Sequence, residues 1–92
     1  METQEARLKR LRMRSWRRGT KEMDLVLGPY ADAHLDGMSD ARLTLYDALL
    51  NENDTDLLPW VLGQTPAPDH LAALIHEIGG FARSRLAAPR GE

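Results

Sequence analysis

The groups most suited to chemistry in this chain surround one predicted helix corner, formed by Arg18, Gly19 and Glu22. A permanently charged base precedes a backbone position without a side chain, and an acid follows in the first turn of the next predicted helix. A carboxylate at that position is stabilised by the positive end of the helix dipole. The trio is typical either of a polar binding corner or of an ordinary helix C-cap followed by a first-turn acid.

The usual catalytic and metal-binding patterns are absent from the sequence. His70 and His76 are six residues apart, whereas two side chains on one helix face are about three or four apart. No serine has a nearby histidine that would activate it, and the chain has neither cysteine nor a glycine-rich phosphate loop. We place His34 on or beside the buried stripe of the second helix as a satisfied bundle residue. We therefore expect no enzymatic activity and no metal site.

Apolar residues recur at helical spacing in five segments, which must position this corner. The clearest stripe runs through residues 23–35, and the others run through 8–16, 43–50, 57–62 and 71–82. The connections between them are short, so neighbouring helices are expected to run antiparallel. The sequence predicts an all-α, compact single-domain bundle of about five short helices, with a basic first helix over about 5–17 and the corner at 18–22.

Glycine, proline and serine mark the ends of these helices. Gly37 is expected to end the second helix in the left-handed conformation, and Ser39 is expected to cap the third. Pro29 predicts a kink in the second helix but no break, because the apolar stripe continues in phase beyond it. The fourth helix is expected over about 55–62, with Asn53 or Asp56 as its cap and Gly63 as its end, while Pro59 leaves open a later start near itself. Pro66 or Pro68 is expected to start the fifth helix.

Composition supports a single helical domain over residues 1–92. The chain has 15 Leu and 11 Ala but only 2 Val and 2 Ile, so strong helix formers far outnumber the β-branched residues that sheets prefer. A second core would not close in 92 residues. No apolar run is long enough to cross a membrane. Residues from about 87 to 92 are expected to form a flexible tail.

Charge is divided unevenly along the chain. Residues 1–21 carry eight Lys or Arg and two acids, a net +6, whereas residues 22–92 carry four Arg and twelve acids, a net −8. The simplest interpretation is a basic first helix that packs against an acidic body. Two alternatives are binding to nucleic-acid phosphates and attraction of an acidic protein partner. The basic stretch lacks the interleaved aromatic residues that stack on single-stranded bases, which argues against nucleic acid.

Residues 18–22 (Arg-Gly-Thr-Lys-Glu) resemble the Arg-Gly-x-x-Glu motif of the succinate dehydrogenase assembly factor family, small proteins that promote flavin attachment to the flavoprotein subunit of that enzyme. The apolar segment 25–30 and the segment 38–50 are similar to the second and third helices of the family. The acidic turn 53–56, followed by Trp60, is also similar. The resemblance covers about residues 11–86, and Pro59 departs from it.

The resemblance implies a helical chaperone that binds the flavoprotein subunit of succinate dehydrogenase, with that of fumarate reductase as a further client. The motif would dock beside the flavin site, and the covalent bond to flavin would form within the partner. In this interpretation Arg18 directs its forked guanidinium to a carboxylate or to carbonyls of the partner. Gly19 lets the partner's backbone approach, and Glu22 pairs with a basic or amide group. A polar rim is formed by Arg17, Lys21 and Asp24.

Two alternative functions differ in the ligand that the chain would bind. A nucleic-acid module acting through the basic first helix predicts steeply salt-dependent binding to duplexes. A flavin carrier predicts that FAD itself binds, but only five aromatic residues are present and most are assigned to the core. We therefore expect no stably bound cofactor, no nucleic-acid partner, no membrane insertion and a monomer. Glu2 and Glu5 interrupt the basic start, unlike a mitochondrial transit peptide, so we expect a bacterial, cytoplasmic protein.

Overall fold

Helices account for almost all of the fold in the computed structural model, which describes residues 2–87 and the side chains of residues 2–85. The elements are α1 (Gln4–Trp16), α2 (Lys21–His34), the short 3-10 helix η1 (Leu35–Gly37), α3 (Asp40–Leu50), α4 (Asp54–Val61) and α5 (Asp69–Ala87). No strand occurs among the described residues. The predicted all-α class is confirmed. Apart from Ala87, which ends α5, the predicted tail lies outside the described residues.

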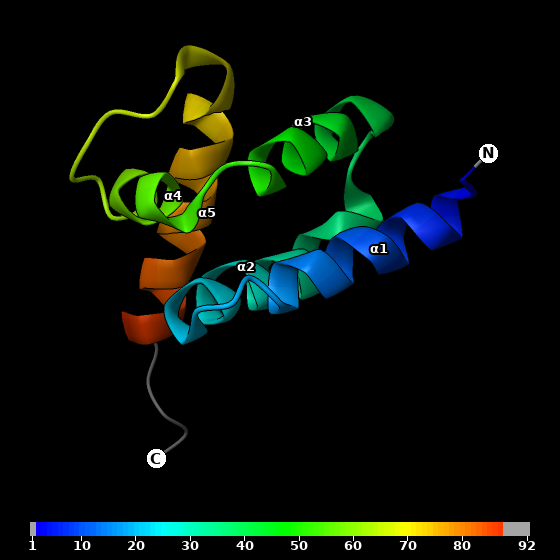
Figure 1. Ribbon diagram of the computed structural model, residues 1–92, viewed down its shortest axis with the longest axis horizontal. Helices are drawn as coiled ribbons and strands as arrows, with labels where there is room; N and C mark the ends of the chain where they lie inside the picture. The colour runs from blue at the N-terminus through cyan, green and yellow to red at the C-terminus, as the bar shows by residue number, and fades with distance from the viewer. Residues whose placement is uncertain (1, 88–92) are drawn as a thin grey trace.

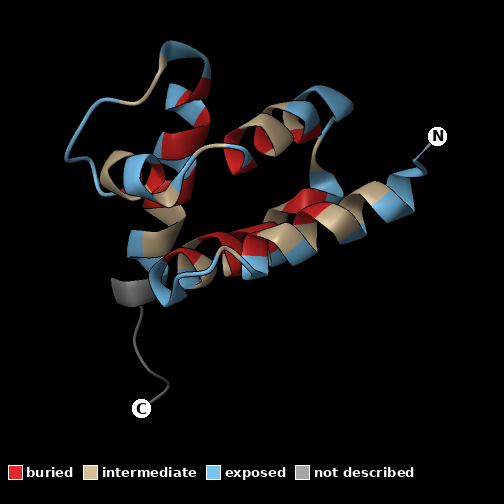
Figure 2. Ribbon diagram, viewed as in Figure 1, coloured by how far each residue is buried: buried red, intermediate tan, exposed pale blue. Residues whose placement is uncertain are grey.

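The helices enclose one apolar core. α1 and α2 run antiparallel along one side of the molecule, α3 packs against α1, and α5 packs against α2 and α3 with α4 beside it (Figure 1). Buried residues lie on the parts of these helices that face one another (Figure 2). Burying each leucine contributes about 1.5–3 kcal/mol relative to exposure. The largest fully buried side chains are Tyr30, Tyr46, Leu11, Met23, Leu27, Leu35, Leu43, Leu49, Leu57, Leu71, Leu74 and Ile78.

Several predicted helix boundaries are confirmed. The Ser39 side-chain oxygen accepts the backbone N–H of Arg42 at 3.2 Å and caps α3. α2 continues through Pro29 without a break. Gly63, with a φ of +76°, follows the C-cap of α4 and ends that helix. Within the described residues, none of these helices has both the length and the apolar character that crossing a membrane requires.

One predicted helix end is wrong. Gly37 does not adopt the left-handed conformation. Among the described residues, positive φ occurs only at Gly19 and Gly63. The chain leaves α2 through η1 instead, and the Met38 N–H donates to the Leu35 carbonyl at 3.2 Å. Of the two starts left open for α4, the earlier is observed, because Asn53 is the N-cap and the helix begins at Asp54 and contains Pro59. Burial of apolar side chains in α4 offsets the backbone hydrogen bond that its proline cannot donate.

Trp16 fixes the packing of α1 on α2 just before the corner. A Cβ built on Gly28 would lie only 2.3 Å from the indole Cδ2 of Trp16, so a larger residue at Gly28 would displace the ring. The indole Nε1 donates to Asp32 at 3.2 Å. The end of α1 is therefore held against the middle of α2, and the connection between the two helices has a fixed geometry.

A buried polar pair joins α1 to α3 inside the core. Ser15 donates to the Leu11 carbonyl at 2.8 Å, and its oxygen lies 2.6 Å from the hydroxyl oxygen of Tyr46. Because the serine hydroxyl has only one hydrogen, the Tyr46 hydroxyl is the donor of the second bond. The phenol must keep its proton to make this bond.

Alkaline pH is expected to destabilise the fold through Tyr46. Burial raises the pKa of Tyr46 to about 12 from the ordinary 10.0, so the unfolded chain releases this proton at a lower pH than the folded chain does. The stabilisation is complete below about pH 10 and is lost as the pH rises toward 12, by about 3 kcal/mol in total. Urea unfolding between pH 9 and pH 12 measures this loss as a falling free energy of unfolding.

The matched variant for this experiment is Tyr46→Phe, which removes the titrating group. Burial also raises the pKa of Tyr30, so the variant should retain part of the alkaline loss. We expect a shallower decline in the free energy of unfolding for Tyr46→Phe than for the wild type. Equal slopes in the two proteins would show that Tyr46 does not titrate in the folded state as described.

Candidate partner-binding site

The corner between α1 and α2 is built around Gly19, which is exposed and has a φ of +99°. Residues with a side chain rarely adopt this backbone conformation. A Cβ built at Gly19 would meet no atom within 4 Å, so the space beside the corner is open. Thr20 then caps α2, since its side-chain oxygen accepts the N–H of Met23 at 3.4 Å. The predicted backbone corner at Gly19 is present and reachable from solvent.

Arg18 points into the molecule and binds the turn between α3 and α4. Its side chain is only 11% exposed. Its Nε donates to Asp54 Oδ1 at 2.9 Å. Nη1 donates to the Leu50 carbonyl at 2.5 Å, and Nη2 donates to the Glu52 carbonyl at 2.6 Å. The fork that the sequence interpretation directs toward a partner is used inside this chain, where it satisfies carbonyls at the end of α3.

Two further hydrogen bonds hold the corner in place. The backbone N–H of Arg18 donates to Asp24 Oδ1 at 2.7 Å, and the Thr20 hydroxyl donates to Asp54 Oδ2 at 3.2 Å. Asp54 therefore accepts hydrogen bonds from both sides of Gly19. Asp24, which the sequence interpretation places on the rim, is half-buried and binds the backbone of the corner.

The remaining motif residues are available at the surface. Glu22, Arg17 and Lys21 are exposed. None of the three forms an ion pair with any described side chain. The structure thus brings a bare backbone position, one carboxylate and two cations together on the outside, while Arg18 and Asp24 support them from within.

Asp54 is the residue of this corner that sequence reasoning missed. It lies 36 positions from Arg18 in the sequence, and no local periodicity connects the two residues. The only available signal is that the acidic turn 53–56 belongs to the segments that resemble the family. The structure gives that turn a role, because it supplies the carboxylate and carbonyls that hold Arg18.

The basic first helix packs against acidic residues of the same chain. The Asp47 carboxylate lies between two arginines, 3.0 Å from Arg10 and 2.7 Å from Arg14. Hydrogen bonding to Arg10, assisted by the charge of both arginines, lowers the pKa of Asp47. The simplest interpretation of the charge division is confirmed, and the nucleic-acid alternative loses its main support. The other ion pairs of α1 are Arg7–Asp40, Arg10–Glu2, Arg12–Asp32 and Arg12–Asp36.

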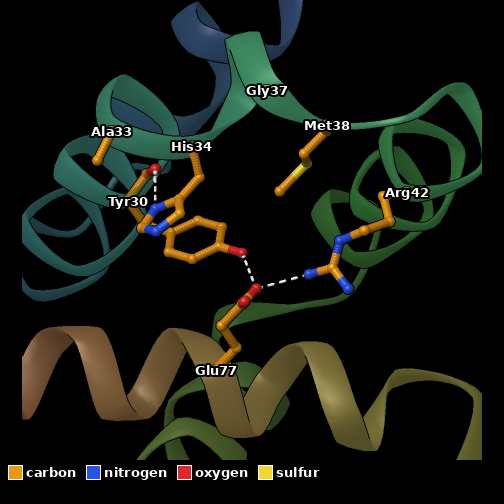
Figure 3. Close-up of a pocket in the computed structure, with 7 residues that line it drawn as sticks. All are labelled: Tyr30, Ala33, His34, Gly37, Met38, Arg42 and Glu77. Atoms are coloured by element: carbon orange, nitrogen blue, oxygen red, sulfur yellow. Dashed lines mark hydrogen bonds and ion pairs between the residues drawn. The ribbon is translucent and has the colours of Figure 1, made fainter.

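A second polar cluster lies at the opposite end of α2, in a cavity of ≈ 280 Å³ (Figure 3). Tyr30 and Arg42 both donate to one carboxylate oxygen of Glu77, which joins α2 and α3 to α5. The His34 ring stacks on Tyr30 with centroids 4.5 Å apart, and its Nδ1 lies 3.2 Å from the Tyr30 carbonyl. His34 is thus a satisfied packing residue, as predicted. The cluster links three helices, and its lining contains no serine, threonine or cysteine.

Comparison with known proteins identifies the family. A family model described as flavinator of succinate dehydrogenase matches residues 9–82, which include the whole Gly19 corner. The chain belongs to this family. The resemblance carried by residues 18–22 is therefore confirmed over most of the chain.

Relatives in fungi and bacteria carry related names. The protein named succinate dehydrogenase assembly factor 2, mitochondrial, of Meyerozyma guilliermondii is 44% identical over 71 residues, covering 74% of this chain and 53% of the relative. The protein of the same name in Schizosaccharomyces pombe is 36% identical over 86 residues, covering 91% of this chain and 62% of the relative. The FAD assembly factor SdhE of Acetobacter pasteurianus is 36% identical over 67 residues, covering 73% of this chain and 62% of the relative. The chain thus matches between 53% and 62% of the length of these three relatives.

Proposed function

We propose that this chain is an assembly factor that binds the flavoprotein subunit of succinate dehydrogenase and promotes covalent attachment of FAD to it. The flavoprotein of fumarate reductase is proposed as a further client. One observation carries the proposal: the exposed Gly19 corner is held rigidly and lies inside the region that the family model matches. A protruding backbone without a side chain, flanked by exposed charges, suits insertion beside a partner's loop.

The proposed contacts divide between the surface and its support. Gly19 admits the partner's backbone at close range, and the Glu22 carboxylate accepts hydrogen bonds from a basic or amide group. Arg17 and Lys21 form a polar rim, where each contact contributes less. Arg18 and Asp24 act by position, since their hydrogen bonds fix the corner before the partner arrives.

We further propose that the chain is not an enzyme and holds no FAD stably. The covalent bond forms within the partner, and the assembly factor acts by binding one conformation of the partner more tightly than the others. Only that difference in affinity raises the population of the competent conformation. We place this activity in the bacterial cytoplasm with the chain as a monomer. The Acetobacter relative supports a bacterial setting.

Co-expression tests this function directly. The flavoprotein subunit is produced in a host without its own factor of this family, with and without this chain, and covalent flavin is read as in-gel fluorescence. We expect several-fold more fluorescence per subunit when the chain is present. Purified chain mixed with FAD is the control for flavin binding by the chain itself, and the fluorescence of the added FAD should remain unquenched. Equal covalent flavin with and without the chain would refute the proposal.

A further inference from the structure

An apolar groove lies directly beside the Gly19 corner, between the first turns of α2 and the last turns of α5. These two segments pack side by side (Figure 1). The groove has a volume of ≈ 330 Å³, within the range of cavities that hold ligand groups. Its lining residues are Glu22, Leu25, Val26, Ala82 and Arg85.

Leu25 lines this groove and is exposed to solvent, and it is not part of the buried core. Its side chain is 49% exposed, and it is one of only four large apolar side chains exposed among the described residues. The core face of α2 is supplied by other residues, Met23 and Leu27 among them. Leu25 lies three residues beyond Glu22, about 4.5 Å along the helix axis. Residues three apart share a helix face, so the motif carboxylate and this leucine open to the same side.

The mouth of the groove carries one acid and one base. Glu22 lies on the α2 side, and Arg85 lies on the α5 side. Neither forms an ion pair with any described side chain. All four arginines of α1, in contrast, pair with carboxylates of the same chain. The groove therefore has an apolar centre with opposite charges at its edges, which is the arrangement of an interface core and its rim.

The size of a protein interface requires contacts beyond the corner. A specific, stable interface buries about 800 Å² on each partner, from about 20–30 residues. Gly19, Glu22 and their neighbours form only a small part of such an area. The groove is continuous with the corner through Glu22. A partner seated on the corner would therefore also cover Leu25.

We propose that this groove receives an aliphatic or aromatic side chain of the flavoprotein subunit. That side chain is flanked by a basic group facing Glu22 and an acidic group facing Arg85. The inference rests on the proposed function, and it adds the α2–α5 groove to the Gly19 corner as the apolar centre of the same interface. Leu25, Val26 and Ala82 then supply apolar burial, while the corner supplies close backbone contact.

The test compares Leu25→Arg with Leu62→Arg in binding to the purified, flavin-free flavoprotein subunit by titration calorimetry. Leu62 is 55% exposed and does not line the groove, so it is a matched control for placing a charge on an exposed leucine. We expect Leu25→Arg to raise the Kd by about 10- to 100-fold, a loss typical of an interface anchor. Leu62→Arg should stay within about twofold of the wild type. Thermal unfolding of both variants verifies the fold.

A second variant, Ala82→Phe, fills the groove from α5 without adding charge. It should weaken binding to a similar extent even if Leu25→Arg does not fold. Wild-type chain that fails to bind the flavoprotein would refute the proposed function itself. Loss of binding in Gly19→Arg, with wild-type binding in Leu25→Arg and Ala82→Phe, would overturn the groove and leave the function standing. Concentration-dependent dimers in light scattering that disappear in Leu25→Arg would assign the groove to a second copy, and would also overturn the inference.

Discussion

Gly19→Arg is expected to abolish the gain in covalent flavin that the wild-type chain produces. At a φ of +99° any side chain strains the backbone, by about 1–2 kcal/mol. Nothing lies within 4 Å of the new Cβ, so no clash inside the chain adds to that cost. The helical fold should therefore survive, while a long cation occupies the space in which we place the partner's backbone. In-gel flavin fluorescence and circular dichroism measure the two effects separately.

Gly63→Arg is the matched control for this prediction. Gly63 also has a positive φ, +76°, and open space around its Cβ position. It lies beyond the end of α4, outside the proposed interface. The control carries the same kind of backbone strain and the same added charge, and it should promote flavin attachment as well as the wild type does. If both variants lose the activity to the same degree, the loss reflects stability, and the assignment of the corner is wrong.

Arg18→Ala is expected to lower the free energy of unfolding by about 3 kcal/mol. Arg18 is nearly buried and satisfies the Asp54 carboxylate together with the Leu50 and Glu52 carbonyls. Removing it leaves a carboxylate without its cation and two carbonyls without their donor. For a domain of this size each kcal/mol lowers Tm by about 4–8 °C, so Tm should fall by more than about 10 °C. Thermal unfolding followed by circular dichroism measures this shift.

Arg17→Ala provides the stability control for Arg18→Ala. The neighbouring arginine is exposed and forms no ion pair with the described side chains, so its loss should change the free energy of unfolding by less than about 0.5 kcal/mol. Arg18→Lys should recover little of the loss, because one ammonium group does not reproduce a planar fork. A melting temperature of Arg18→Ala equal to that of Arg17→Ala would show that the observed hydrogen bonds do not stabilise the fold.

The helical elements were predictable because their information is local. The stripe of α2, the Ser39 cap and the Gly19 corner each depend on residues within a few positions of one another. Local rules for proline and glycine were less decisive than the apolar spacing. Pro59 lies inside α4, where buried neighbours in that helix offset its cost. Gly37 has a permissive backbone, yet the chain took the alternative turn through η1.

Local sequence patterns could not predict which residues of the candidate site are exposed and which support it from within. The motif spacing identified Arg18 but not the direction of its side chain, because its acceptors lie 32 to 36 positions away. The groove was equally hidden, since it joins α2 to α5. Glu22 and Gly19, by contrast, lie on the outside of a single corner, where the sequence alone placed them.

The pairing of the α1 arginines with carboxylates of their own chain has a kinetic consequence. Opposite charges held 2.7–3.9 Å apart produce little field beyond about 10 Å in physiological salt. Diffusional encounter with another protein then gains little from long-range steering. An association rate constant in the ordinary range of about 10⁵–10⁶ M⁻¹s⁻¹, weakly dependent on ionic strength, is what such a self-neutralised helix implies.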